Sequence, residues 1–215
     1  MRFEVLNVDK QAIPDLLCDN GVIRLHPSAF YDNIPREYLR AWCHFNGRYS
    51  VVTTELISWL KALIGERKAI EIGAGAGDLS YYLGIKATDL RIMERPEVAL
   101  QYKLMGQPTT PYGSFVKRLE ALDAIERFEP EVVIASWVTE WIDPTLPPPP
   151  QGGCVYGVKE DLLLKTGVTY VLIGNEAQHG QKQILSEFHE TYRFPWLRSR
   201  AIDPSKNLIY VWPGR

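Results

Sequence analysis

The first third of the chain carries two amphipathic stripes of helical period. Apolar residues recur at helical spacing from just after Pro35 as far as Phe45, which predicts a first helix. A second stripe over 56–64 follows a threonine that can cap it and stops at Gly65. We therefore expect an N-terminal helical cover over residues 1–65.

Apolar runs later in the chain predict the strands of a parallel sheet. The runs over 69–72, 131–138 and 168–173 are mainly aliphatic, a pattern typical of strands that are buried on both faces. Helix-like stripes separate these runs, so strands and helices alternate along the chain. Near the end, 198–202 and Asn207–Trp212 have strand character and are joined by a turn-rich link, which predicts a hairpin.

Length, charge and cysteine usage narrow the class of protein. The 215 residues suit one α/β domain with a sizeable core. A net charge of −2 gives no sign of the positive charge that nucleic-acid binding requires. No apolar run approaches the roughly 20 residues of a membrane span. The N-terminus lacks a signal-peptide layout, and Cys18, Cys43 and Cys154 suggest neither disulfides nor a metal site. We expect a cytoplasmic protein that binds a small molecule and uses no metal, nucleic acid or membrane.

The strongest functional signal is a loop with three glycines directly after the 69–72 run. Gly73, Gly75 and Gly77 let the backbone turn sharply and approach a ligand without an intervening β-carbon. Glu71 precedes them by two residues. Asp78 stands where the dinucleotide fingerprint G-x-G-x-x-G requires its last glycine, so that fingerprint is absent. Asp78 also opens the next helix, where an acid is favoured as a cap.

This segment resembles motif I of the class I S-adenosylmethionine-dependent methyltransferases, an acid followed by G-x-G-x-G at the end of the first strand. The resemblance implies a three-layer, Rossmann-like α/β fold with a seven-stranded, mostly parallel sheet and an antiparallel last strand. It places this core at 66–215, behind the N-terminal helical cover. It also implies that S-adenosylmethionine is the cofactor, with Glu71, Gly73, Gly75 and Gly77 contacting it.

In the same family, an acid at the end of the second strand binds the ribose hydroxyls, because a carboxylate accepts two hydrogen bonds from a vicinal diol. Asp89 and Glu94 compete for this role. Spacing of about 20 residues from the glycine loop favours Glu94. Gly84, however, closes a short helix, so the strand that follows ends at Asp89, which we prefer. With this alignment, most of the chain resembles a group of small methyltransferase-like proteins, a resemblance that brings no substrate with it.

The third strand is expected to be short or irregular, because Pro111 and Gly113 interrupt its pattern. By resemblance, an acid that contacts adenine lies just beyond it. Glu120 and Asp123 are the available acids, and the stripe ending at Phe128 predicts that both decorate the polar face of a helix. Glu120 is the candidate adenine contact.

By resemblance, the end of the 131–138 strand is motif IV and faces both cofactor and acceptor. Ser136 is therefore a candidate cofactor ligand, and Trp137 and Trp141 are candidate walls for the substrate. Glu140 and His179 are weak candidates for a general base, since histidine has a suitable proton affinity and lies just after the fifth strand. A dedicated base is not required for methyl transfer to an acceptor that is already deprotonated.

Two loops complete the predicted site. Residues 45–49 are a lid candidate, although an ordinary surface loop is favoured, and the prolines at 147–150 are expected to form a connector or a rim. Our hypothesis is methyl transfer from S-adenosylmethionine to a small molecule. The alternatives are an NAD(P)-dependent oxidoreductase and a binding protein of the same fold without turnover.

Overall fold

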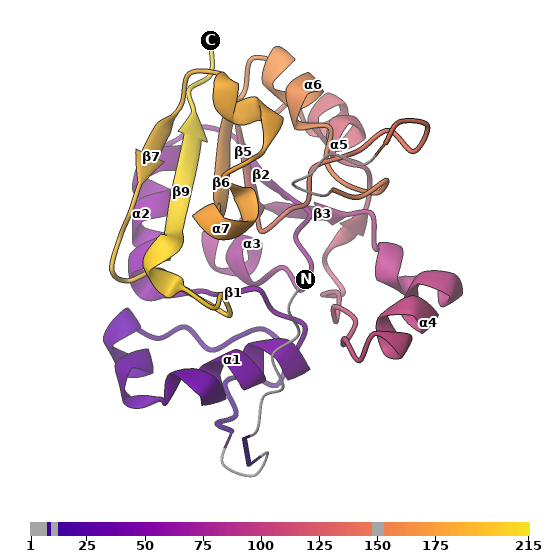
Figure 1. Cartoon of the computed structure of the whole chain (residues 1–215). Coiled ribbons are helices and arrows are strands. Elements are labelled where there is room, and N and C mark those ends of the chain that lie inside the picture. Colours follow the sequence, from indigo (N-terminus) through magenta and orange to yellow (C-terminus); the bar gives the residue numbers. More distant parts are fainter. Residues whose placement is uncertain (1–7, 10–12, 148–152) are drawn as a thin grey trace.

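The computed structural model describes residues 8–9, 13–147 and 153–215 (Figure 1). The helices are η2 Ser28–Asn33, α1 Arg36–Phe45, α2 Thr54–Ile64, α3 Asp78–Leu83, η3 Ile92–Glu94, α4 Pro96–Leu104, α5 Ala121–Phe128, α6 Glu160–Lys165, α7 Glu176–His179, η4 Gln183–Ser186 and η5 Pro204–Lys206. The strands are β1 Ser50–Val51, β2 Ala69–Ile72, β3 Lys86–Asp89, β4 Lys117–Arg118, β5 Val132–Ser136, β6 Thr169–Asn175, β7 Glu190–Tyr192, β8 Arg198–Ser199 and β9 Asn207–Trp212. None of the helices in the described ranges is long and apolar enough to cross a membrane.

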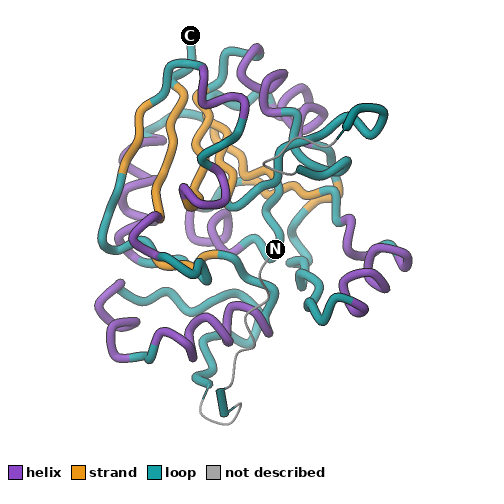
Figure 2. The backbone as a smooth tube through the Cα atoms, in the orientation of Figure 1, coloured by secondary structure: helices purple, strands orange, loops and turns teal. Residues whose placement is uncertain are grey.

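Seven strands form one sheet in the order β4-β3-β2-β5-β6-β9-β7, visible in orange in Figure 2. All neighbouring pairs are parallel except those of β9, which runs antiparallel to β6 and to β7. The predicted seven-stranded, mostly parallel sheet with an antiparallel last strand is confirmed. From β2 the chain moves outward to β3 and β4 and then returns to the other side of β2 with β5. The carboxyl ends of β2 and β5 therefore form a topological switch point, where open α/β sheets bind their ligands.

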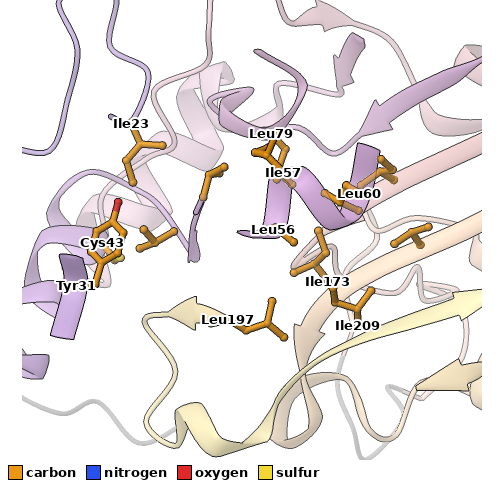
Figure 3. Packing of buried hydrophobic residues seen from close by; sticks show 14 of the residues in the cluster. Ile23, Tyr31, Cys43, Leu56, Ile57, Leu60, Leu79, Ile173, Leu197 and Ile209 are labelled. Atoms are coloured by element: carbon orange, nitrogen blue, oxygen red, sulfur yellow. The ribbon is translucent and has the colours of Figure 1, made fainter. Parts of the chain in front are cut away.

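Helices cover both faces of this sheet, and alternate residues of each strand divide between two cores. In β5, Val132 and Ile134 belong to the core that includes α2 and α3, whereas Val133 and Ala135 belong to the core that includes α5. Figure 3 shows the first core, with Leu60 of α2 beside sheet residues such as Ile173. Helix α2, predicted as part of the N-terminal cover, thus packs directly on the sheet.

The predicted helix boundaries are largely confirmed. Pro35 occupies the cap position before α1, and the Thr53 hydroxyl accepts a hydrogen bond of 3.2 Å from the Leu56 N–H at the start of α2. Gly84 closes α3 in the left-handed conformation, with φ of 70°. As a result β3 is short and Asp89 is its last residue, as predicted.

The predicted C-terminal hairpin is wrong. β8 pairs with β1, not with β9, and forms a separate two-stranded sheet in which Val51 faces Arg198. The neighbour of β9 at the sheet edge is β7, which the sequence pattern missed. β7 has only three residues, Glu190–Tyr192, and none of them is buried, so it carries no apolar run that would reveal it.

A buried ion pair joins the N-terminal segment to the helix after the glycine loop. Asp78 Oδ2 lies 3.1 Å from Arg48 Nε, and Asp78 Oδ1 accepts a hydrogen bond of 2.9 Å from the Ile23 N–H. Arg48 also donates to the backbone oxygens of Gly21 and Asn46. Asp78 stands in the first turn of α3, as expected of an acid there, and its carboxylate oxygens also bind Ile23 and the buried guanidinium of Arg48.

Replacing Arg48 should destabilise the whole chain. Arg48→Met leaves the Asp78 carboxylate buried without its counter-charge, so the free energy of unfolding is expected to fall by about 3–5 kcal/mol. Urea denaturation followed by circular dichroism measures this change. The matched control is Arg193→Met, which breaks a half-exposed ion pair with Glu176 and should cost less than about 1 kcal/mol. Equal effects of the two variants would contradict a structural role for the buried pair.

Candidate functional site

A cleft of about 260 Å³ opens at the switch point. It is lined by the loop after β2, the ends of β3 and β5, the start of α5, and residues from the segments 47–52 and 154–158. These segments are far apart in the sequence, but the parallel strands bring their carboxyl ends to one edge of the sheet. The volume is slightly below the roughly 300–1,000 Å³ common for small-molecule sites.

The glycine loop forms one wall of this cleft. Gly73 and Gly75 adopt left-handed φ values of 56° and 55°, which favour glycine, and both line the cleft. A β-carbon on Gly73 would lie 2.5 Å from Val138 Cγ1, so no side chain fits there. Gly77 precedes α3 and packs against Phe115, and it is not among the described residues that line the cleft. The loop thus presents bare main chain to the cleft at its first two glycines.

Glu71 lies buried at the base of the cleft. Only 2% of its surface is exposed, and its Oε2 accepts a hydrogen bond of 2.9 Å from the Ser80 N–H. Burial raises the pKa of Glu71 to about 8, so its carboxyl group is mostly protonated at neutral pH.

Asp89 stands at the end of β3 and lines the cleft beside the glycine loop. Its Oδ2 accepts a hydrogen bond of 2.9 Å from the Gly75 N–H, and its Oδ1 accepts one of 2.7 Å from the Arg91 N–H. Burial raises the pKa of Asp89, and these backbone donors oppose the shift. Because a carboxylate has about four acceptor positions, Asp89 retains capacity for a ligand diol.

Glu94 occupies a different environment. It lies in η3, and its two carboxylate oxygens pair with Arg91 and Arg118 at 2.5 Å each. Hydrogen bonds from Arg91 and then Arg118 lower the pKa of Glu94. Glu94 is not among the described cleft residues, so of the two acids proposed for ribose binding the fold brings only Asp89 to the glycine loop.

Glu120 lies at the cleft, not on the solvated helix face predicted for it. It is the cap residue of α5, and its Oε2 accepts a hydrogen bond of 2.7 Å from the Leu122 N–H. Asp123, in the first turn of α5, is exposed as expected. The signal that could have placed Glu120 is its position immediately before the helix, where side chains with acceptor oxygens are favoured.

The end of β5 carries a strained tryptophan. Ser136 lines the cleft with its Oγ 3.0 Å from Ser50 Oγ, and Trp137 follows with φ of 60°. Bulky residues rarely adopt this left-handed conformation. A hydrogen bond of 2.9 Å from the Trp137 N–H to the Ile173 oxygen holds it there, while the indole packs against Tyr49. Strain of this kind is a marker of functional sites.

The two candidate bases lie outside the cleft lining. His179 is buried behind Trp137, with 5.3 Å between ring centroids, and its Nδ1 accepts a hydrogen bond from the Asn175 N–H. Burial, and then the charge of Lys182, lower the pKa of His179 to about 4, which makes it a weak base at neutral pH. Glu140 Oε1 accepts a hydrogen bond from Gln183, and its buried Oε2 has no partner within the described ranges.

The two loops predicted at the site are the lid candidate at 45–49 and the prolines at 147–150. Gly47, Arg48 and Tyr49 line the cleft, so part of the 45–49 segment forms a wall of the site. The prolines at 147–150 fall mostly outside the described residues. Trp141 is not among the described lining residues; it bridges to Cys154, with Lys159 4.9 Å above its ring.

Sequence reasoning missed three of the four tyrosines that line the cleft. Tyr49 lies in the lid candidate at 45–49, but Tyr102, Tyr112 and Tyr156 come from segments in which no site residue was predicted. Across the described ranges, no group of three histidine, cysteine or carboxylate side chains gathers to hold a metal. The site therefore combines bare main chain and carboxylates on one side with aromatic rings on another, an arrangement suited to a polar cofactor and a flat apolar partner.

Comparison with known proteins adds no identification. No model of a known protein family matches the chain, and no curated protein matches it either.

Glu71 should make stability depend on pH. The folded state holds its proton up to about pH 8 and the unfolded state releases it near pH 4.5, so the folded state binds more protons between these values. The free energy of unfolding should therefore fall as pH rises across this window, by up to about 1.4 kcal/mol per pH unit. Glu71→Gln, which keeps the acceptor for Ser80, should flatten the dependence in denaturation curves measured from pH 4.5 to 8. An unchanged slope would show that Glu71 ionises normally.

At position 137, a glycine variant should be more stable than an alanine variant, which is the reverse of the usual order. Within helices and strands, glycine is about 0.5–1 kcal/mol less favourable than alanine, and Trp137 stands just after β5. A left-handed conformation costs a residue with a β-carbon roughly 1–2 kcal/mol, so Trp137→Gly should be more stable than Trp137→Ala by about 1 kcal/mol. Chemical denaturation of the two variants measures this difference. A more stable alanine variant would mean that the backbone relaxes and stores no strain.

Proposed function

We propose that the chain is a class I S-adenosylmethionine-dependent methyltransferase that acts on a small molecule. The observation that carries this proposal is the junction of the glycine loop with Asp89. A bare main-chain turn after β2 hydrogen-bonds to the carboxylate that ends the adjacent strand, and both face the switch-point cleft. The sheet order and the antiparallel β9 support the same assignment.

The cleft residues fit the parts of this cofactor by their chemistry. Asp89 supplies acceptors for the ribose hydroxyls, and the main chain at Gly73 and Gly75 lines the cleft where it can contact the methionine part. Beyond Asp89, apolar Leu119 and the acid Glu120 offer a surface and an acceptor for an adenine ring. Arg48 pairs with Asp78 and Glu71 is mostly protonated, so the carboxylates of Asp89 and Glu120 have no partner cation among the described lining residues, which suits a cofactor with a positive sulfonium.

When bound, S-adenosylmethionine supplies an electrophilic methyl group. The contribution of the chain is then to hold the acceptor in line and to exclude water. Ser136 and Trp137, at the end of β5, stand beside the glycine loop where the acceptor would enter. Neither weak candidate base lines this region, so we propose a reaction that relies on positioning.

Binding of S-adenosylhomocysteine, the demethylated product, tests the assignment without requiring the acceptor. Isothermal titration should detect binding to the wild-type chain. Asp89→Asn should weaken it by about ten- to a hundredfold, since a hydrogen bond to a charged group contributes about 1.5–3 kcal/mol. The matched control Glu94→Gln, which alters the competing acid outside the cleft, should change the affinity less than twofold.

Four results would contradict the proposal or redirect it. No binding by a folded wild-type chain would remove the assignment, and the reverse order of the two variants would move the ribose site to Glu94. Binding of NADH in place of S-adenosylhomocysteine, detected by NADH fluorescence, would favour the oxidoreductase alternative. Cofactor binding without transfer to any of a broad panel of acceptors would favour a binding protein of this fold.

A further inference from the structure

One part of the cleft is built almost entirely from aromatic rings. We call the residues Tyr49, Tyr102, Trp137, Cys154 and Tyr156 the aromatic subsite. The rings of Tyr49 and Trp137 lie 5.9 Å apart, and Tyr102 is in contact with Tyr49. The Tyr156 N–H donates to Cys154 Sγ at 3.4 Å, and the Tyr156 side chain is 40% exposed. The subsite thus has a packed interior and an open margin, as expected of a place where a flat molecule enters.

Among the described residues, no cation lines the aromatic subsite itself: Arg200 and Arg95 pack against the rings of Tyr49 and Tyr156 but do not line the cleft. Arg48 is the single cation among the described lining residues, and its guanidinium is already engaged by Asp78 and by backbone oxygens. Asp89 and Glu120 in the same cleft would repel a carboxylate or a phosphate. An acceptor that carries negative charge is therefore disfavoured.

The rings are also unsuited to a ligand that is already cationic. The guanidinium of Arg200 lies 3.7 Å from the centre of the Tyr49 ring, and that of Arg95 lies 5.3 Å from the centre of the Tyr156 ring. A cation on one face of a ring repels a second cation on the other face and so weakens the second cation–π interaction. A neutral aromatic molecule, which can stack on these rings, fits best.

The aromatic subsite lacks a proton acceptor of the usual kinds. Its polar groups are tyrosine hydroxyls and one thiol, and it contains neither carboxylate nor imidazole. An alcohol or a phenol must lose a proton before or during methyl transfer, which calls for a base within hydrogen-bond reach. A ring nitrogen of the pyridine type needs none, because its lone pair is free in the neutral molecule.

Building on the proposed methyltransferase function, we propose that the aromatic subsite binds a neutral heteroaromatic amine and that the chain methylates its ring nitrogen. The nitrogen lone pair forms the new bond to the methyl carbon, and the carbon–sulfur bond breaks with its electron pair going to sulfur. The positive charge moves from sulfur to nitrogen, and no proton is transferred. The product is a cation, which the arginine-backed rings hold less well than its neutral precursor, so the site favours its release.

The strained Trp137 supports this placement independently. The backbone holds a bulky ring at φ of 60° beside the subsite, where a glycine would be relaxed. The backbone thus fixes the position of the indole, which provides a rigid platform for a stacked ligand.

Quinoline serves as the probe, with the chain saturated by S-adenosylhomocysteine. Titration should show binding of quinoline and at least about tenfold weaker binding of quinoline-4-carboxylate, which adds a negative charge. Tyr156→Ala should weaken quinoline binding by about tenfold, because it removes a stacking surface at the open margin. Tyr81→Ala is the matched control: Tyr81 is 49% exposed on α3, outside the described cleft lining, and its loss should change the affinity less than twofold.

A second measurement tests the reaction itself. With S-adenosylmethionine present, mass spectrometry should detect N-methylquinolinium and no methyl ether from 1-naphthol, the matched phenol. Methylation of naphthol in preference to quinoline, or equal binding of quinoline and its carboxylate, would overturn the inference. So would quinoline affinity unaffected by Tyr156→Ala. Failure of S-adenosylhomocysteine to bind at all would instead remove the proposed function, so the two failures are distinguishable.

Discussion

The cleft depends on the buried ion pair between Arg48 and Asp78. Two segments meet there that share no strand: the stretch that runs from Ile23 to Arg48 and the helix that starts after the glycine loop. Because both partners are almost fully buried, neither can lose the other without leaving a charge in an apolar setting. The pair therefore fixes the position of residues 47–49 relative to the glycine loop. It thereby also fixes the wall of the cleft that Tyr49 provides.

The sheet supplies the rest of the site by its connectivity. Since β3 and β4 lie on one side of β2 and β5 lies on the other, the loops after β2 and β5 diverge and leave a crevice between them. Polar and charged groups reach this crevice from the β3 side, through Asp89 and Glu120. Aromatic groups reach it from several segments: Trp137 and Tyr156 follow β5, Tyr102 and Tyr112 lie between β3 and β4, and Tyr49 precedes β2.

The sequence predicted those parts of the structure whose signals are local. The buried strands could be predicted because both of their faces are apolar. The position of Asp89 at the end of β3 could be predicted because Gly84 marks the helix end just before that strand. The partner of β8 was missed because pairing with β1 depends on contacts about 150 residues apart in the chain. Tyr102, Tyr112 and Tyr156 were missed for the same reason: each lies in a segment without a motif, and only the fold brings them together.

The position of β9 has a consequence for biosynthesis. It is the last strand in sequence, yet it lies inside the sheet, and all six of its residues are buried between β6 and β7. A nascent chain that has not yet released 207–212 from the ribosome exposes the bare edge of β6, while β7 has nothing to pair with. The cleft edge and the glycine loop form from earlier residues, but the sheet behind them closes only afterwards. Premature termination ahead of β9 would therefore yield an aggregation-prone fragment with an exposed strand edge, and not a smaller functional protein.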